Sequence, residues 1–557
     1  MLTSAGVIHD LWYKNAVIYC LNVETFLDSN GDGIGDFVGL TDRLPYLAGL
    51  GVTCIWLLPF YPSPNEDDGY DVTDYYGIHK RAGTLGDFVE FMNEARQFGL
   101  RVIVDLVANH TSIKHPWFQA ARKDPDSLYR QYYVWSKTRP RNWNKGMVFP
   151  GVQRATWTRD DIANAYYFHR FYDFQPDLNT RNPAVKEELM RIMGFWLQLG
   201  ISGFRMDAAP FLIERKGAGV RPGRDYELLH EMRHFLQWRR GDAILLAEAN
   251  VPPNQSLEYF GERGDRLQMM LNFWVNQRIF LALATGDVSA LKQALLATYE
   301  RPSGAQWGVF LRTHDELDLG RLTPAQRASV FAAFAPEKRM QLYNRGIRRR
   351  LAPMLNNDRR RIELANSLMF SLPGTPVLRY GDEIGMGDDL TLPERYAART
   401  PMQWSPHRQG GFTSGRRPIR RVIADPIYGF KSVNVADQRR DPNSLLNWTE
   451  RMIRTRKECA EIGWGDWIVL GQMPDHVLAI RYDWNDRSTI VLHNFLERPC
   501  AVRLRVEGPT GMKLINLLSQ EACEADDSGR YRIDLEPYGY RWMRVGQMER
   551  PIAKALQ

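Results

Sequence analysis

Residues 201–208, Ile-Ser-Gly-Phe-Arg-Met-Asp-Ala, form an apolar run that ends in an arginine and a carboxylate. Side chains alternate across a strand, so Arg205 and Asp207 point to the same side of a predicted buried strand. The guanidinium is expected to lower the pKa of the Asp207 carboxyl and keep it ionised. An ionised carboxylate that is held in place can act as a nucleophile.

A second apolar run, residues 243–248, ends in Glu248 and has no basic residue beside it. This environment is expected to raise the pKa of Glu248 and favour the protonated acid. One ionised and one protonated carboxyl are the pair that retaining glycosidases use. Taken alone, the two residues are equally well explained as strand-end charges that reach solvent.

Similar apolar strands recur along the chain and alternate with helix-like segments. They lie at residues 16–19, 52–58, 102–107, 203–208, 244–248, 308–311 and 376–378. Such strands are typical of parallel sheets buried on both faces, and here polar residues gather at the strand ends. The pattern predicts an α/β fold, a (β/α)₈ TIM barrel with its site on the C-terminal face.

Two regions depart from this alternation and define the predicted domains. Residues 111–180 are rich in Trp, Tyr, Pro and Asn and too long for an ordinary loop, which predicts a subdomain inserted after the third strand. Residues 462–557 contain short alternating strands with turn signals, which predict a C-terminal antiparallel β-sandwich. The catalytic barrel is therefore expected in two parts, residues 1–110 and 181–461.

Composition excludes several classes of protein. The net charge of +7 is a small imbalance among 72 basic and 65 acidic residues, so nucleic acid is not an expected partner. No run of 18 apolar residues predicts a membrane span, and residues 1–10 lack the features of a signal peptide. Five cysteines without metal-ligand spacing predict buried thiols. A cytoplasmic protein is expected.

Two further strand ends carry groups suited to sugar chemistry. Residues 105–110 begin with Asp105 and end in Asn109 and His110, and residues 310–316 contain His314 followed by Asp315. A histidine and a carboxylate can hold adjacent sugar hydroxyls and distort the ring toward an oxocarbenium-like transition state. Alone, His110 is more often structural, and Asp315 is explained equally well as a helix cap.

In this order and spacing, residues 105–110, 203–208, Glu248 and residues 314–315 resemble the four sequence regions of the α-amylase superfamily, glycoside hydrolase family thirteen. The resemblance covers nearly the whole chain. It implies that Asp207 is the nucleophile, Glu248 the acid/base and Asp315 the transition-state stabiliser. It also implies supporting, substrate-binding roles for Arg205, His110 and His314.

Residues 56–64, 247–250, 346–353, 381–387 and 444–448 look most like trehalose synthase (maltose α-D-glucosyltransferase). Further motifs resemble the branch that contains oligo-1,6-glucosidase and trehalose synthase. They are residues 175–179, which begin with Gln175, residues 67–71 and residues 398–404. By this resemblance Asp67 and Arg399 grip the 4-hydroxyl of a terminal glucose, and Tyr70 stacks beneath its ring. The site is then a pocket that excludes longer chains, with Gln175 among its substrate-binding residues.

Three segments depart from that branch and are expected to line the acceptor side of the pocket. They are residues 217–225, residues 271–274, and Arg379 in place of a tyrosine. The donor glucose is therefore better supported than the acceptor.

A loop near the N-terminus places oxygen ligands at alternate positions around glycines, as calcium loops do. A structural Ca²⁺ (or Mg²⁺) is predicted there, held by Asp28, Asn30, Asp32, the Ile34 carbonyl and Asp36. A second site at Asn109 and Asp177 has weaker support. No organic cofactor is expected.

The leading hypothesis is a retaining enzyme that forms a β-glucosyl-enzyme on Asp207 and isomerises maltose and trehalose by intramolecular glucosyl transfer. The alternatives are an α-glucosidase or transglucosidase with another acceptor, a phosphorylase, and a non-catalytic carbohydrate-binding homologue. The expected partners are small α-glucosides such as maltose and trehalose, and assembly into a homo-oligomer is left open.

Overall fold

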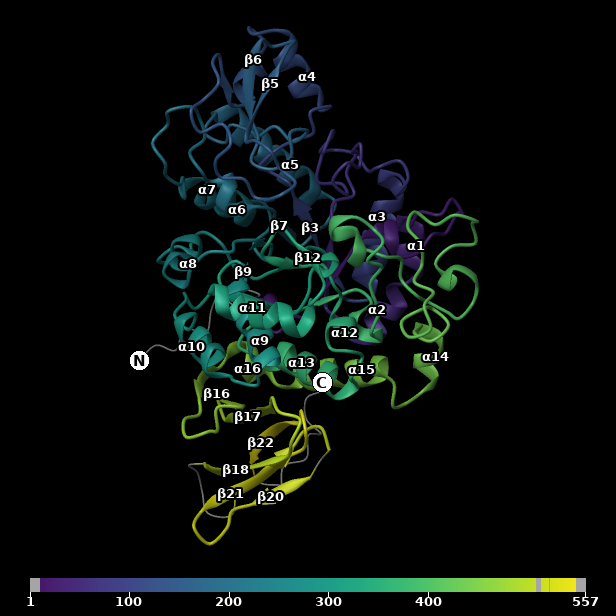
Figure 1. The fold of residues 1–557 in the computed structure, drawn as a ribbon, viewed down its shortest axis with the longest axis vertical. Helices are drawn as coiled ribbons and strands as arrows, with labels where there is room; N and C mark the ends of the chain where they lie inside the picture. Colours follow the sequence, from purple (N-terminus) through teal and green to yellow (C-terminus); the bar gives the residue numbers. More distant parts are fainter. Residues whose placement is uncertain (1–10, 507–511, 520, 547–557) are drawn as a thin grey trace.

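The computed structural model describes residues 11–506, 512–519 and 521–546. Residues 1–10, from which the absence of a signal peptide was predicted, lie outside this range. In Figure 1 the inserted segment lies at one end of the long axis, the barrel in the middle and the C-terminal strands at the other end. Within the described ranges, no helix has both the length and the apolar character needed to cross a membrane.

Eight parallel strands close into a barrel, as predicted, in the order β1-β14-β10-β9-β8-β7-β3-β2. Their bounds are β1 (Ile18–Leu21), β2 (Cys54–Leu57), β3 (Arg101–Leu106), β7 (Gly203–Met206), β8 (Ile244–Ala247), β9 (Met269–Leu271), β10 (Gln306–Phe310) and β14 (Thr375–Arg379). Ile18 pairs with both Cys54 and Val377, which closes the ring. Strands buried on both faces explain their continuous apolar sequence.

Helices connect the barrel strands and carry the apolar faces that cover them. They are α1 (Phe37–Asp42), α2 (Leu44–Leu50), α3 (Leu85–Gln97), α5 (Pro183–Gln198), α6 (Ala209–Leu212), α7 (Glu227–Arg239), α8 (Pro253–Phe260), α9 (Phe273–Thr285), α10 (Ser289–Ala297), α11 (Pro324–Phe334), α12 (Leu351–Met354), α13 (Arg359–Ser371), α14 (Val435–Arg440), α15 (Leu445–Glu458) and α16 (Ala460–Trp464). In α3, Thr84 and Asp87 form a capping box, which satisfies otherwise unpaired N–H groups at the start of the helix.

The segment between β3 and α5 leaves the barrel. It contains α4 (Pro116–Lys123) and a small antiparallel sheet, ordered β4-β6-β5, of β4 (Trp135–Ser136), β5 (Trp157–Asp160) and β6 (Ala165–Phe168). A bridge between His110 and Asp177 joins its two ends above β3. The segment therefore returns to the C-terminal face of the barrel, where Gln175 and its neighbours reach the site.

The C-terminal strands form two antiparallel sheets that share one apolar core. One sheet is ordered β15-β16-β17-β22-β19-β20 and the other pairs β18 with β21. Their bounds are β15 (Asp466–Val469), β16 (Val477–Trp484), β17 (Arg487–Asn494), β18 (Cys500–Arg505), β19 (Lys513–Asn516), β20 (Ala522–Glu524), β21 (Arg530–Leu535) and β22 (Tyr540–Gly546). Val502 and Ile533 pack with Ile490 between the sheets, which confirms the predicted sandwich.

All five cysteines are free thiols, as predicted. Cys20, Cys54 and Cys459 are buried, whereas Cys500 and Cys523 in the C-terminal sheets are only half-buried.

Candidate active site

The two carboxyls at the centre of the site follow neighbouring strands. β7 begins at Gly203, where a Cβ would lie 2.2 Å from the carbonyl oxygen of Ile244 in β8. Only glycine permits this approach at its φ of +144°. Asp207 and Glu248 are each the first residue after their strand. The close pairing of β7 and β8 therefore brings both carboxyls to the lining of one cavity of about 480 Å³.

Arg205 connects the carboxyls of three strands. Its Nη1 donates to Asp207 Oδ1 at 2.7 Å and to Asp105 Oδ1 at 3.0 Å, and its Nη2 donates to Glu248 Oε2. The Arg205 side chain is 1% exposed. The expectation that Glu248 has no basic neighbour is therefore wrong, because β7 and β8 pair side by side and Arg205 reaches across.

The two carboxyls differ in pKa in the order that was expected, but for another reason. Burial raises the pKa of Asp207 to about 6, although Arg205 opposes the rise. The predicted lowering at Asp207 is thus wrong, because desolvation outweighs the guanidinium. Burial also raises the pKa of Glu248 to about 8, again against Arg205 and with the charge of Asp315 adding to the rise. At neutral pH Asp207 is mainly ionised and Glu248 mainly protonated.

Tyr70, His314 and Asp315 form a connected set beside Asp207. The Tyr70 hydroxyl donates to Asp105 Oδ2 at 2.7 Å and lies 2.7 Å from His314 Nε2. The rings of Tyr70 and His314 are stacked, with centroids 5.6 Å apart. His314 Nε2 lies 3.1 Å from Asp315 Oδ2. Tyr70 and Asp315 line the cavity, which places them within reach of a bound sugar.

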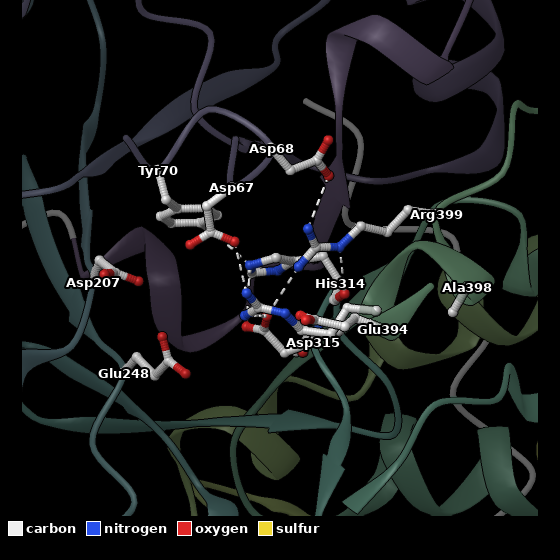
Figure 2. Close-up of polar contacts among 12 residues, drawn as sticks. Asp67, Asp68, Tyr70, Asp207, Glu248, His314, Asp315, Glu394, Ala398 and Arg399 are labelled. Carbon is white, nitrogen blue, oxygen red and sulfur yellow. Dashed lines mark hydrogen bonds and ion pairs between the residues drawn. The ribbon is translucent and has the colours of Figure 1, made fainter. Parts of the chain in front are cut away.

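Two arginines hold the far end of the cavity. Arg395 donates to Asp67 Oδ1 at 2.7 Å and to Asp315 Oδ1 at 2.8 Å. Arg399 donates to Asp68 Oδ2 at 2.9 Å and to Asp315 Oδ1 at 3.1 Å (Figure 2). Asp67 and Arg399, predicted to act together on one hydroxyl, are thus not paired directly. Sequence reasoning missed Arg395, although it stands four residues before Arg399 in the same segment.

The charges at this end follow from burial and from these cations. Burial raises the pKa of Asp67 to about 6, against the pull of Arg395. At Asp315 burial is outweighed by His314, Arg395 and Arg399, which hold the pKa of this carboxyl well below its usual range. Asp315 is therefore an anion across the working pH range of most enzymes.

Gln175 and His110 occupy different layers of the site. Gln175 is buried behind Asp67 and donates to its Oδ2 at 2.9 Å, so it orients the carboxylate. His110 lines the cavity, and its buried Nε2 has no hydrogen-bond partner among the described residues. Burial lowers the pKa of His110 to about 4, so the ring is neutral at pH 7. A neutral Nε2 aimed at the cavity suits a sugar hydroxyl.

The predicted calcium loop is held by its own hydrogen bonds. Asp28 accepts from the N–H groups of Asn30, Gly31 and Gly33. Asp36 accepts from the Ser29 hydroxyl at 2.8 Å, and Asp32 from the N–H of Ile34 at 2.8 Å. Across the described ranges, no three His, Cys, Asp or Glu side chains converge as metal ligands would. Calcium at this loop stays a prediction.

An ammonium occupies the place of the weaker second metal site. Lys216 Nζ lies 2.8 Å from Asp177 Oδ2 and donates to Asn109 Oδ1 at 2.7 Å. The Lys216 side chain is 2% exposed. A side-chain cation therefore joins the inserted segment to the barrel, and the prediction of a metal there is wrong.

The opposite half of the cavity contains the segments that depart from the family pattern. Arg224, from residues 217–225, and Phe273 both line it. Arg379, expected on this side, is instead buried at the end of β14 and donates to the carbonyl of Ala398. Aromatic and charged groups that sequence reasoning did not single out also line the cavity: Phe149, Phe171, Phe211, Glu316, Asp318, Arg321, Arg327 and Arg345.

Comparison with known proteins gives matches along almost the whole chain. The family model "Alpha amylase, catalytic domain" matches residues 20–465, and "Sucrose hydrolase-like, C-terminal domain" matches residues 487–544. The trehalose synthase of Pimelobacter sp. (strain R48) is 42% identical over 550 residues, which cover 96% of this chain and 96% of that protein.

Two further proteins extend the comparison. The trehalose synthase of Thermus thermophilus is 43% identical over 546 residues, which cover 97% of this chain but only 56% of that longer protein. The solved structure of the trehalulose synthase from Pseudomonas mesoacidophila MX-45 superposes with a TM-score of 0.75 at 26% identity, covering 96% of this chain and 99% of that one.

Proposed function

Since this chain belongs to the α-amylase family, we propose that it is a retaining enzyme in which Asp207 carries the glucosyl group and Glu248 moves the proton. The chain is an enzyme of the glucosyl isomerase or transferase kind. One observation carries the assignment of roles: Arg205 contacts both carboxyls where they line a single cavity. Their pKa values of about 6 and about 8 leave one ionised and the other protonated at pH 7.

In the first step Glu248 donates its proton to the glycosidic oxygen. The bond from the anomeric carbon to that oxygen breaks, and a bond to an Asp207 oxygen forms. The hydrogen bond from Arg205 holds the attacking carboxylate in one orientation. Asp315, kept anionic by three cationic or polar neighbours, is positioned to hold ring hydroxyls as positive charge develops at the anomeric carbon.

In the second step an acceptor hydroxyl gives its proton to Glu248 and attacks the anomeric carbon. The bond to Asp207 breaks, and an α-glucoside leaves with retained configuration. Arg395 joins Asp67 and Asp315 at the far end of the cavity, and we infer that this wall limits the space beside Asp207 to a single glucosyl unit. The substrate is therefore cleaved at a terminal glucose.

We infer that the main reaction interconverts maltose and trehalose, with the released glucose kept in the cavity between the two steps. This choice draws on the similarity to two trehalose synthases along the length of the chain. Hydrolysis is the side reaction that follows when water replaces the glucose.

Product analysis tests this proposal. The full-length protein is incubated separately with maltose, trehalose, sucrose and isomaltose, with labelled free glucose added, and the products are separated by anion-exchange chromatography. We expect trehalose from maltose and maltose from trehalose, with little label in either product because transfer is internal. Absence of turnover of all four sugars would refute the proposed function.

A second candidate is a transglucosidase that passes the glucosyl group to another alcohol. It is favoured by the acceptor half of the cavity, where Arg224 and its neighbours bring several charges that a neutral glucose does not require. In the same assay it would give free glucose and, once an acceptor is added, a new glucoside in place of trehalose.

A further inference from the structure

Four arginines line the acceptor half of the cavity, and we call them the arginine rim: Arg224, Arg321, Arg327 and Arg345. Arg224 precedes α7, whereas the other three come from residues 321–345, which follow β10. Two separate crossovers of the barrel thus bring cations to one side of one cavity.

Few carboxylates neutralise the rim. Arg345 Nε lies 3.5 Å from Asp318 Oδ1. Among the described residues, this is the only ion pair that a rim arginine forms with a carboxylate. Asp318 is also engaged elsewhere, since it accepts from Asn250 Nδ2 at 2.8 Å and from the N–H of Gly320 at 2.7 Å. Asp318, which also accepts these two hydrogen bonds, therefore leaves most of the positive charge of the four guanidinium groups uncompensated.

The remaining contacts of the rim are with neutral groups. Arg224 donates to Gln255 Oε1 at 2.8 Å, Arg321 to the carbonyl of Asn250 at 2.6 Å, and Arg327 to the carbonyl of Leu322 at 3.3 Å. In addition, the Nε atom of Arg327 is buried without a hydrogen-bond acceptor among the described residues, whereas Arg345 Nε faces the Asp318 carboxylate at 3.5 Å. Buried donors without an acceptor indicate a place where a ligand can supply one.

The cavity is therefore polarised along its length. The carboxyls of Asp67, Asp207, Glu248 and Asp315 line the cavity together with the guanidinium of Arg395. Glu316 lies close enough to Arg395 to feel its charge, and Asp318 pairs with Arg345 of the rim. Burial raises the pKa of Glu316 to about 7, which reduces the negative charge opposite the rim. The carboxylates beside Asp207 repel an anionic group on a ligand, whereas the arginine rim attracts it. This difference sets the orientation in which a charged ligand binds.

We propose that the acceptor half of this cavity takes a hydroxy compound bearing a carboxylate or a phosphate, and that Arg327 and Arg345 bind this oxyanion. Guanidinium groups present paired N–H donors that match the oxygens of both anions. The inference rests on the proposed function, because it requires a glucosyl group on Asp207. It adds to the transfer onto retained glucose an external acceptor, for which an anionic alcohol is preferred over a neutral one.

The chemistry balances without a further reactant. An α-glucoside such as maltose loses its aglycone as free glucose when Asp207 attacks and Glu248 protonates the leaving oxygen. The hydroxyl of the anionic acceptor then gives its proton to Glu248, its oxygen bonds to the anomeric carbon, and the bond to Asp207 breaks. The product is an α-glucoside that carries the negative charge.

Matched acceptors test the proposal. The full-length enzyme is given maltose together with glycerol, glycerate or glycerol 3-phosphate, and separately with glucose, gluconate or glucose 6-phosphate. Transfer products are measured by mass spectrometry, and released glucose is measured in parallel. We expect the charged acceptors to exceed their neutral partners by about tenfold or more in acceptor kcat/KM, mainly through a lower KM, with the preference falling as salt is added. The two arms show whether carboxylate or phosphate is preferred.

Variants connect the preference to the rim. Arg327→Gln combined with Arg345→Gln is expected to remove most of the preference for charged acceptors, and the corresponding Lys pair to keep part of it. Arg408→Gln combined with Arg451→Gln removes the same charge at exposed positions outside the cavity lining and is expected to keep the preference. If the first pair fails to fold by circular dichroism, the single variants Arg327→Gln and Arg345→Gln give the same readout, one guanidinium group at a time.

The outcomes separate this inference from the proposed function. Turnover of maltose with equal use of neutral and charged acceptors, or a preference that survives in the rim variant, overturns the inference and leaves the proposed function standing. Failure to cleave any α-glucoside overturns both.

Discussion

Arg395→Gln is the most informative substitution, because Arg395 joins two acids that a bound glucose would also contact. The variant removes hydrogen bonds of 2.7 Å to Asp67 and 2.8 Å to Asp315. A hydrogen bond to a charged group contributes about 1.5–3 kcal/mol, so the pair amounts to about 3–6 kcal/mol. Arg399 still neutralises Asp315, which leaves about half of this loss, about 1.5–3 kcal/mol, or roughly tenfold to a hundredfold in kcat/KM.

The loss is expected to show in a pH-dependent way. Burial already raises the pKa of Asp67 to about 6 against the pull of Arg395. Without that cation the pKa of Asp67 rises further, so the carboxyl becomes protonated near neutral pH and no longer accepts from a sugar hydroxyl. The activity of the variant should therefore fall more steeply below pH 7 than that of the parent enzyme.

The assay is the initial rate of maltose and 4-nitrophenyl α-glucoside cleavage from pH 5 to 9, with the melting temperature recorded for each protein. Arg395→Lys keeps a positive charge but lacks the paired N–H donors of the guanidinium group. Its kcat/KM should therefore lie between those of the parent and Arg395→Gln. Arg408→Gln is the matched surface control. If kcat/KM for Arg395→Gln stays within threefold of the parent while the fold is intact, the bridge between Asp67 and Asp315 is not needed for catalysis, and this reasoning fails.

Three further predictions concern the catalytic pair and the cations of the fold. The kcat/KM of the enzyme should fall below a pH of about 6, as Asp207 takes up a proton, and above a pH of about 8, as Glu248 loses one. In Glu248→Gln the fall at alkaline pH should disappear, and the rate should drop by at least about a hundredfold. An unchanged pH profile in this variant would exclude Glu248 as the acid. Lys216→Met leaves Asp177 buried without its cation and should lower the free energy of unfolding by about 3–5 kcal/mol in denaturant titrations, whereas a loss below about 1 kcal/mol would show that the pair is not needed for stability. For the loop at residues 28–36 we propose one bound Ca²⁺ per chain, measured by elemental analysis, and a lower melting temperature after chelation; metal-free protein with an unchanged melting temperature would contradict it.

Most of the fold could be predicted from the sequence, because buried parallel strands leave long apolar runs. The exception among the barrel strands is β9, which sequence reasoning did not identify. It consists of Met269, Met270 and Leu271, too short for a periodic signal and without the β-branched residues that favour strands. Its existence depends on pairing with β8 and β10, which is a property of the closed barrel and not of three residues.

The candidate site was predicted where motifs lie at strand ends and missed where partners come from elsewhere in the chain. Asp207 and Glu248 follow their own strands, so their common position was predictable from barrel geometry. Arg395 is 80 residues from Asp315 and 328 from Asp67 in the sequence, and its loop has no periodic pattern. The other three rim arginines and Lys216 were missed for the same reason, because each arginine or lysine alone resembles a solvated surface charge, whereas Arg224 lies in the segment 217–225 that was expected to line the cavity.

The separation of the two catalytic pKa values depends on the sharing of one cation. Arg205 faces the carboxyls of Asp105, Asp207 and Glu248, and burial raises the pKa of all three, to about 6 for Asp105 and Asp207 and to about 8 for Glu248. One guanidinium cannot offset three buried negative charges, so at neutral pH the protein holds a proton on the group with the highest pKa. That group is Glu248, whose pKa of about 8 is the highest of the three and which also feels the anion of Asp315. Burial and the number of carboxyls around Arg205, and not the residues beside each one in the sequence, therefore give a protonated Glu248 and an ionised Asp207, the states that the proposed mechanism requires.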